Sequence, residues 1–125
     1  MIVIDAGVVV DLVIGVVDPA CLSDEELAVP HLIDSEVTNA LRLLARRRAL
    51  TEKQADLAFD GFSQLVLSRF PAEPLRRRMW ELRGNLSAYD ATYVALAEAL
   101  GATALLTTDA RLAAAPGINC LVKVV

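Results

Sequence analysis

The sequence predicts an α/β domain in which helices cover both faces of a central parallel sheet. Short apolar runs at residues 2–4 and 104–107 are typical of buried strands, and β-branched residues dominate the first of them. Segments with the apolar spacing of helices separate these runs, and strands that alternate with helices form parallel sheets. The 125 residues contain no linker, repeat or low-complexity segment. We therefore expect one domain that spans residues 1–125.

The first half of the chain predicts two strands and two helices. The first strand ends at Asp5, and Pro30 stops the second. Between them, residues 8–17 are apolar without a spacing that decides their type, and residues 23–26 favour a loop or a short exposed helix. The residues Thr51-Glu52-Lys53-Gln54 fit a capping box, which begins a helix. The expected elements are strands at 2–4 and 27–29 and helices at about 35–48 and 52–67, the second helix burying Ala55, Ala58, Phe59, Phe62, Leu65 and Val66.

The second half of the chain predicts three helices and two strands. Ser87 is an expected N-cap, and Gly101 closes the long apolar helix that follows it. Gly84-Asn85 and Pro116-Gly117 end two other helices. The expected elements are helices at 74–83, 88–100 and 110–115 and strands at 104–107 and 118–125.

The composition describes an apolar chain. The hydrophobic fraction is 55% and the mean hydropathy is +0.47, so we expect a core together with some surface covered by a partner. No uninterrupted apolar run reaches the roughly 18 residues of a membrane span. The first basic residue is Arg42, so we expect no signal peptide and a location in the cytoplasm.

Cysteine and histidine are scarce. Cys21 and Cys120 are the only cysteines, and we expect both to be free, buried thiols. Together with the single histidine, His31, they cannot build a usual zinc site. His31 follows Pro30 in an expected loop, where a structural role is favoured over that of a general base.

The charge distribution bears on the class of partner. A formal charge of −4 and a pI of about 4.9 argue against a general nucleic-acid coat, which is usually basic. They do not exclude a nuclease, because acids gathered around a metal ion account for part of the negative charge. Six of the ten arginines lie in two triplets, at residues 46–48 and 76–78. The triplets are either exposed helix faces or contacts for phosphate or for an acidic partner segment.

Four acids stand where strands end or helices begin. Asp5 and Asp109 follow apolar runs, and Glu36 and Asp90 lie near the starts of two expected helices. In a parallel α/β domain, the carboxyl ends of the strands and the amino ends of the adjoining helices share one edge, where ligands bind. Carboxylate oxygens suit Mg²⁺ or Mn²⁺, and a metal held this way indicates phosphodiester or phosphoryl chemistry.

Each of these acids also has a local explanation. Asp5 could face solvent at the end of its strand, and Glu36 could complement a helix dipole. Asp90 follows Ser87 as in a capping box, and Asp109 could cap the next helix.

Neighbouring polar residues could assist such a site. Asp34 could be the N-cap of its helix, and Asn39 lies one turn beyond Glu36, where it could hydrogen-bond the carboxylate. The hydroxyls of Thr107 and Thr108 could position a ligand or a water molecule.

Four segments surround the acids, in this order: Met-Ile-Val-Ile-Asp5-Ala, Asp34-Ser-Glu36-Val-Thr-Asn39-Ala-Leu, Ser87-Ala-Tyr-Asp90-Ala-Thr-Tyr-Val-Ala-Leu-Ala and Leu-Leu-Thr107-Thr-Asp109. Together they resemble the PIN-domain ribonucleases, and in particular the VapC toxins of bacterial VapBC toxin–antitoxin systems. Their order and spacing match the family over essentially the whole chain. The resemblance implies a three-layer α/β/α PIN-like fold with a central parallel sheet. It also implies a Mg²⁺-dependent endoribonuclease, with Mn²⁺ as an alternative ion.

The resemblance further implies a site and partners. Thr107 would lie beside the acidic quartet. Independently of the resemblance, Arg111 comes shortly after Asp109, where it could steady an RNA backbone. A cognate VapB-like antitoxin would occlude the site, and the toxin would form a homodimer and a toxin–antitoxin hetero-oligomer. Many family members carry a small hydroxyl residue two positions after the first acid, where this chain has Gly7, so a hydroxyl contact to the site would be missing. The quartet that would hold the metal and catalyse hydrolysis is Asp5, Glu36, Asp90 and Asp109.

Two other protein classes gather acids at strand ends. A phospho-receiver domain would show an acid pair after the first strand and a late lysine, whereas Asp5 stands alone and Lys123 lies more than a strand beyond Asp109. A haloacid-dehalogenase-type enzyme needs Asp-x-Asp, and Gly7 removes the second acid. A DNA-directed or degenerate nuclease stays open as an alternative.

Overall fold

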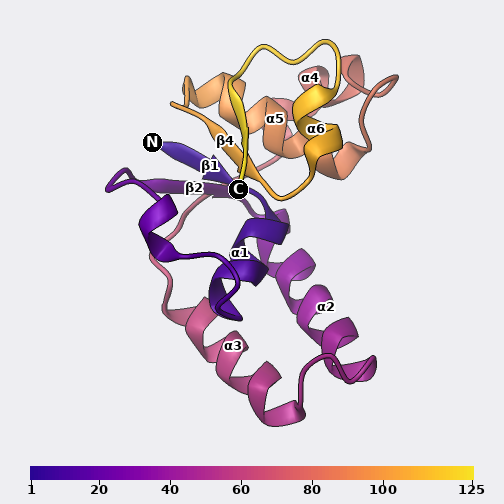
Figure 1. Ribbon diagram of the computed structural model, residues 1–125. Helices are drawn as coiled ribbons and strands as arrows, with labels where there is room; N and C mark the ends of the chain where they lie inside the picture. The colour runs from indigo at the N-terminus through magenta and orange to yellow at the C-terminus, as the bar shows by residue number, and fades with distance from the viewer.

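The computed structural model describes residues 1–125 and is built around a five-stranded parallel sheet in the order β3-β2-β1-β4-β5. In Figure 1, α1, α2 and α3 lie on one side of this sheet and α4, α5 and α6 on the other, so the predicted three-layer α/β/α class is confirmed. The strands are β1 (Ile2–Ile4), β2 (Leu27–Pro30), β3 (Ser68–Phe70), β4 (Leu105–Thr107) and β5 (Val122–Val124). The helices are α1 (Ala6–Val13), α2 (Leu32–Arg46), α3 (Glu52–Gln64), α4 (Arg76–Glu81), α5 (Ala88–Leu100) and α6 (Ala110–Ala114), with 3₁₀ turns at Pro19–Cys21 and Glu73–Leu75.

The order of the strands reverses at β1. The chain passes from β1 to β2 and β3 on one side, then returns to the other side of β1 for β4 and β5. β1 and β4 pair directly, with Ile4 opposite Leu106. Ligands of open parallel sheets bind beyond the carboxyl ends of the strands at such a reversal. Asp5 follows β1 and Thr107 ends β4, so both lie at this crevice.

Helix α5 is the most deeply buried helix and fixes the position of Asp90. All residues from Ala91 to Ala97 are buried, and the helix packs against β1, β2 and β4. A helix that is apolar on all sides is expected to be buried in this way. Ser87 caps its amino end by accepting a hydrogen bond from the Asp90 N–H at 3.2 Å, and Gly101 ends it with a left-handed φ of 58°.

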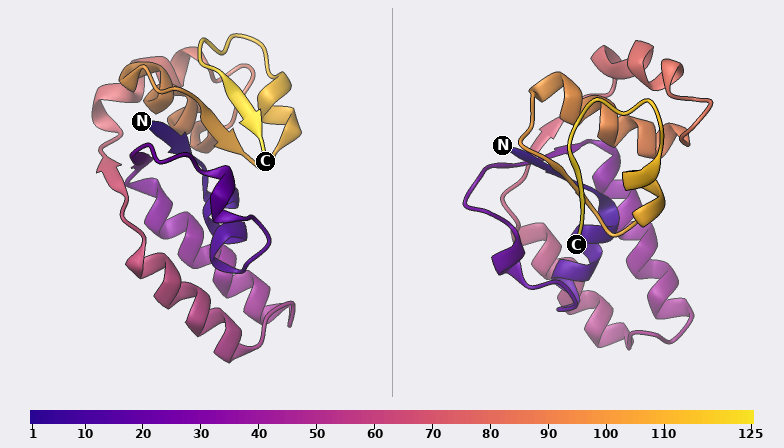
Figure 2. Two further views of the ribbon diagram at one scale, coloured as in Figure 1. Left: turned by 60° about the vertical axis from the view of Figure 1, so that its left-hand side comes forward. Right: turned by 45° about the horizontal axis from the view of Figure 1, so that its top comes forward.

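Helices α2 and α3 form an antiparallel pair that extends beyond the sheet (Figure 2). The predicted capping box is formed: Thr51 Oγ1 accepts from the Gln54 N–H at 3.1 Å, and Gln54 Oε1 accepts from the Thr51 N–H at 2.9 Å. The prediction that Phe59 and Val66 point inward is wrong, because 44% and 89% of these residues are exposed. Helix α3 ends at Gln64, so Val66 leaves the helical face, and only Ala55, Ala58 and Phe62 are buried.

Strand β3 was not predicted from the sequence. Its residues were expected to lie between two helices without a strand of their own. It is an edge strand whose side chains are only partly covered, so it lacks the apolar run that marks β1. Its Arg69 donates two hydrogen bonds to the Asp34 carboxylate, at 2.8 and 2.9 Å. The prediction that Asp34 is the N-cap of α2 is wrong. The helix begins at Leu32 with His31 at the cap position, so Asp34 lies inside the first turn.

Three other boundaries differ from prediction. The apolar segment of undecided type overlaps α1, which begins earlier, at Ala6, and ends at Val13. The helix expected at 74–83 divides into a 3₁₀ turn and α4, and the last strand is limited to β5. Both cysteines are free, but neither is buried, because Cys21 lies on the exposed 3₁₀ turn and Cys120 on the partly exposed segment before β5. None of the helices is both long and apolar enough to cross a bilayer.

Candidate active site

The fold brings the four acids to the carboxyl edge of the sheet. Asp5 and Asp109 are the N-caps of α1 and α6, directly beyond β1 and β4. Glu36 lies early in α2, and Asp90 lies in the first turn of α5. The carboxylate of Asp5 is repelled by those of Asp90 and Asp109, and that of Glu36 by those of Asp90 and Asp5. The four acids therefore form one electrostatically coupled group with Asp5 at its centre.

Thr107 connects two of these acids. Its side chain is completely buried, and its hydroxyl donates to Asp5 Oδ2 at 2.5 Å. The same hydroxyl accepts from the backbone N–H of Asp109 at 3.0 Å. The other Asp5 oxygen accepts from the Val8 N–H at 2.9 Å. Asp5 is therefore held on both oxygens, and Thr107 sets its position relative to Asp109.

Glu36 is positioned by Tyr93, which the sequence did not single out. The Tyr93 hydroxyl donates to Glu36 Oε1 at 2.6 Å, and only 2% of Tyr93 is exposed. Burial and the adjacent Glu36 raise the pKa of the Tyr93 phenol above its ordinary value, so the phenol stays protonated and acts as the donor. The available signal was its spacing, because Tyr93 lies three residues after Asp90 on the same side of a helix.

Burial gives Asp5 and Glu36 an increased affinity for protons. Burial raises the pKa of both carboxyls, and repulsion by the neighbouring acids adds to this effect. The hydrogen bonds from Thr107 and Tyr93 act in the opposite direction without reversing it. Neither carboxylate forms a salt bridge with a lysine, arginine or histidine. The two carboxylates are therefore suited to bind a cation.

Asp109 differs from these two acids. It caps α6 by accepting from the Arg111 N–H at 2.9 Å, and it pairs with the Arg111 guanidinium at 3.3 Å. The hydrogen bond from Arg111 lowers the pKa of the Asp109 carboxyl. Arg111 is 93% exposed on its side chain, so it is free to move away when another ligand approaches.

Asp90 is the acid without a hydrogen-bond partner on its side chain. Ser87 Oγ accepts from the Asp90 N–H, but no reciprocal bond runs from the Ser87 N–H to the Asp90 carboxylate. The capping-box explanation therefore accounts for Ser87 and leaves both carboxylate oxygens of Asp90 available. They face a cleft of about 290 Å³ that Asp90 lines together with Asp109 and Arg111.

Glu36 lines a second cleft, of about 410 Å³, between α1 and α2. Thr108 lines the same cleft, and its hydroxyl occupies the space that a side chain at Gly7 would need. A Cβ built on Gly7 would clash with Thr108 Oγ1 and would lie 3.4 Å from Asp5 Oδ1. The glycine at position 7 therefore leaves room for the Thr108 hydroxyl.

The acids are not collected around a single point. No group of three or more Asp, Glu, His or Cys side chains lies in positions that could hold one metal ion. Tyr93 holds Glu36 and Arg111 holds Asp109, each from its own side of the group. Oxygen donors still fit Mg²⁺, which usually binds one or two carboxylates and keeps several waters. Asn39 is exposed and makes no hydrogen bond to Glu36, so the predicted second contact comes from Tyr93.

Comparison with known proteins identifies the family. A family model described as the PIN domain matches residues 2–118. Ribonuclease VapC1 of Mycobacterium tuberculosis is 43% identical, and the match covers 98% of this chain and 96% of that protein. The chain belongs to the VapC ribonucleases of the PIN-domain family. VapC ribonuclease Mb0985 of Mycobacterium bovis is 46% identical over 83% of this chain and 81% of its own length.

A solved structure supports the PIN-domain assignment. The crystal structure of PAE2754 from Pyrobaculum aerophilum superposes with a TM-score of 0.71 at 28% identity. The superposition covers 97% of this PIN-domain chain and 81% of that one. The resemblance of the four sequence segments to PIN-domain VapC proteins is therefore confirmed.

Proposed function

We propose that this PIN-domain chain is a divalent-metal-dependent endoribonuclease that hydrolyses RNA phosphodiester bonds through Asp5, Glu36, Asp90 and Asp109. The observation that carries the proposal is the state of Asp5 and Glu36. Both are partly buried carboxylates with raised pKa values, and both repel each other and Asp90 without a cationic side chain to balance them. Residues that maintain such an arrangement at the carboxyl edge of a parallel sheet suit a bound cation.

The side chains have separate roles in this mechanism. Mg²⁺, or Mn²⁺ in its place, would be bound by one or two carboxylates of the acidic quartet together with water, and when bound it neutralises phosphate charge and lowers the pKa of water. Thr107 keeps Asp5 at the end of β1, and Tyr93 keeps Glu36 turned toward the acidic group. The open oxygens of Asp90 face the cleft into which a scissile phosphate would enter. Arg111, at the rim of that cleft, would exchange its contact with Asp109 for the RNA backbone.

We further propose the toxin role of a type II toxin–antitoxin pair. A VapB-like antitoxin would neutralise the chain. The chain would act as a single PIN-like domain over residues 1–125 and would form a homodimer and a toxin–antitoxin hetero-oligomer. It would reside in the cytoplasm. The membership of the VapC family supports this role. Large apolar side chains left exposed for a partner support it as well, and they include Val16, Leu57, Phe59, Val66 and Leu121.

RNA cleavage with and without a chelator tests the activity. Wild-type protein is expected to cut RNA with Mg²⁺, to lose the activity in EDTA and to leave a DNA of the same sequence intact. The Asp5→Asn variant should lose at least about 10²-fold in rate, because an uncharged amide is a poor metal ligand, while it can still cap α1. Asp60→Asn, at an exposed acid of α3, is the matched control. Cleavage that survives EDTA, or full activity of Asp5→Asn, would overturn the proposal.

A further inference from the structure

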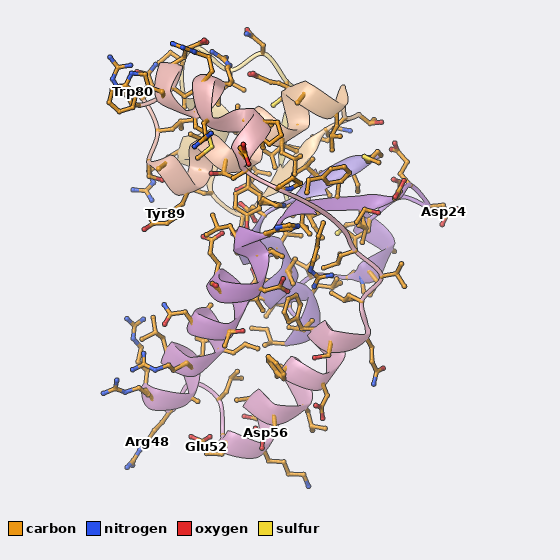
Figure 3. All side chains as sticks on the ribbon, turned by 180° about the vertical axis from the view of Figure 1, so that it is seen from behind. Asp24, Arg48, Glu52, Asp56, Trp80 and Tyr89 are labelled. Atoms are coloured by element: carbon orange, nitrogen blue, oxygen red, sulfur yellow. The ribbon has the colours of Figure 1, made fainter.

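Two large aromatic side chains project into solvent on the same side of the molecule. Trp80 of α4 and Tyr89 of α5 are each 62% exposed, and Figure 3 shows both on one side. Tyr89 directly precedes Asp90 of the acidic site. The segment between the two aromatics supplies Asn85, Leu86 and Ser87 to the wall of the cleft that Asp90 and Asp109 line. The segment that joins the two aromatics therefore borders the cleft of the acidic site.

Arginines accompany Trp80 on α4. The Arg83 guanidinium lies 4.2 Å from the centre of the Trp80 ring, where it also donates to the Trp80 carbonyl at 2.8 Å. Arg76 and Arg77 line a shallow cleft of about 460 Å³ together with Trp80 and with one acid, Glu73. Arg77 and Arg83 form no salt bridge, and the pair between Arg76 and Glu73 is exposed and long, at 3.7 Å. These cations are available to phosphate.

The third arginine of the same triplet has a different role. Arg78 is paired with Glu98 at 2.6 Å and donates to the Gly117 carbonyl at 2.6 Å. Together with a hydrogen bond from Asn85 to the Pro116 carbonyl at 3.2 Å, it fastens α4 to the segment before β5. These contacts hold the backbone of α4 in place, which reduces the entropy cost of binding a ligand there.

We infer that Trp80, Tyr89, Arg77 and Arg83 form a stacking platform that binds single-stranded RNA and guides it into the acidic site. Exposed aromatic rings stack on nucleobases of any sequence, and arginines beside them contact the backbone. Without Arg78, which is paired with Glu98, residues 73–89 contain three arginines and two glutamates, so this segment stays positive in a chain whose net charge is −4. The inference rests on the proposed ribonuclease function and names the substrate surface of that same site.

The chain carries its own probe for this platform. Trp80 is its only tryptophan, so intrinsic fluorescence reports on the platform alone. Metal-free protein in EDTA, where no cleavage is expected, is titrated with a short oligouridylate and an oligoadenylate. Stacking on the Trp80 ring should quench its emission with both oligonucleotides, and a double-stranded RNA should quench it much less. Emission that stays unchanged at saturating single-stranded RNA would overturn the inference.

Steady-state cleavage of a single-stranded RNA measures the contribution of each residue. Trp80→Ala and Tyr89→Ala should each raise KM about fivefold or more, as expected for the loss of one base–aromatic stack, and leave kcat within about twofold. Trp80→Leu should behave like Trp80→Ala, because an apolar side chain of similar exposure cannot stack. Lys53→Ala, at an exposed residue of α3, is the control and should leave KM unchanged. Thermal melting of each variant checks folding.

Salt dependence tests the arginines separately. Arg77→Ala should weaken RNA binding and lower the slope of log affinity against log salt by about 0.7, the value for one phosphate contact on a single strand. Arg46→Ala, from the other triplet, should leave the slope unchanged. Wild-type protein that cuts no RNA contradicts the proposed function. If the wild type cuts RNA and the platform variants keep a normal KM, the platform is contradicted and the ribonuclease function is not. A change of Trp80 emission on dilution without RNA also contradicts the platform, because it would assign this surface to a second copy of the chain.

Discussion

Asp5 and Asp109 both cap a helix at the same edge of the sheet, yet the pKa values of their carboxyls are shifted in opposite directions. Burial raises the pKa of Asp5, whereas the hydrogen bond from Arg111 lowers that of Asp109. Glu36 resembles Asp5, because its partner is the neutral Tyr93 hydroxyl and its pKa is also raised. We call Asp5 and Glu36 the inner acids and Asp109 the outer acid.

The difference lies in the partners. Neutral hydroxyls orient the inner acids without balancing their charge, so the whole negative charge is available to a cation. The Arg111 guanidinium balances the charge of the outer acid, and this arginine must move away before the acid can bind metal. In such a site, the deeper carboxylates carry uncompensated negative charge that can bind a metal ion. The carboxylate at the rim is instead paired with an exposed arginine that can move away.

The sharpest test of this comparison replaces one acid of each kind by its amide. Glu36→Gln should reduce RNA cleavage by at least about 10²-fold, because a charged ligand is lost where no other charge replaces it. Asp109→Asn should reduce it by only about tenfold, because the charge of Asp109 is already shared with Arg111. The amide oxygen can still accept from the Tyr93 hydroxyl in Glu36→Gln and from the Arg111 N–H in Asp109→Asn, so folding should persist in circular dichroism. Equal losses in the two variants would remove the distinction between inner and outer acids.

The next largest effect is expected from Tyr93→Phe. The variant deletes the hydroxyl that positions Glu36 and keeps the ring that fills the core. The apparent Mg²⁺ affinity should fall about tenfold or more, the usual result when a residue that orients a metal ligand is lost. At saturating Mg²⁺, kcat should return to near the wild-type value.

Metal titration of the cleavage rate separates this positioning role from a purely structural one. Unfolding stability should decrease by about 1–2 kcal/mol through the lost hydrogen bond to a charged group, and that loss alone would not change the Mg²⁺ dependence. Tyr89→Phe, which keeps an exposed ring, is the control. An unaltered Mg²⁺ titration would assign Tyr93 to the core alone.

Stability should depend on pH and metal together. Because the pKa values of Asp5 and Glu36 are raised on folding, the folded state binds their protons more tightly than the unfolded chain does. As pH rises from about 4 to neutral and passes the raised values, ionisation costs the folded state more, and the metal-free protein loses stability. Mn²⁺ at a hundredfold excess over its Kd should contribute about 2.7 kcal/mol at neutral pH, or at least about 5 °C in Tm.

The same titration near pH 4 should show almost no gain, because the ligands are protonated. Thermal melts at both pH values, with metal and with EDTA, measure this difference. A gain that is equal at both pH values would mean that the metal binds elsewhere.

The smallest effect is expected from Arg111→Ala. The arginine is almost fully exposed, so Tm should not change measurably. The pKa of Asp109 should rise toward its ordinary range, and the Mg²⁺ affinity should increase about twofold, while KM for RNA rises by a similar factor if the arginine contacts the backbone. Arg48→Ala is a control far from the acids. A fall in Mg²⁺ affinity would contradict the view that Arg111 competes with the metal.

Much of the fold follows from local sequence signals. β1, the capping box before α3 and the long apolar α5 carry strong signals, because burial and capping each impose a residue type. β3 could not be predicted, because an edge strand needs little apolar surface and its place is fixed by pairing with β2. Val66 was misassigned for a related reason: the helical spacing continues in the sequence after the helix has ended at Gln64.

The site was predicted only in part. Strand ends and helix starts placed the four acids at one edge, and Thr107 beside them. The contacts of Tyr93 and Thr108 could not be predicted, because they join residues 57 and 101 positions apart in the chain through side-chain packing. The hydrogen bond between Tyr93 and Glu36 and the close approach of Thr108 to Gly7 exist only in the folded molecule.

The shared space between Gly7 and Thr108 limits which substitutions either position tolerates. A methyl group at position 7 would favour the helix by about 1 kcal/mol over glycine, so selection for stability alone would not keep a glycine there. The methyl group would also have to displace the Thr108 hydroxyl, which occupies the same space. A side chain at position 7 therefore requires a compensating change at position 108.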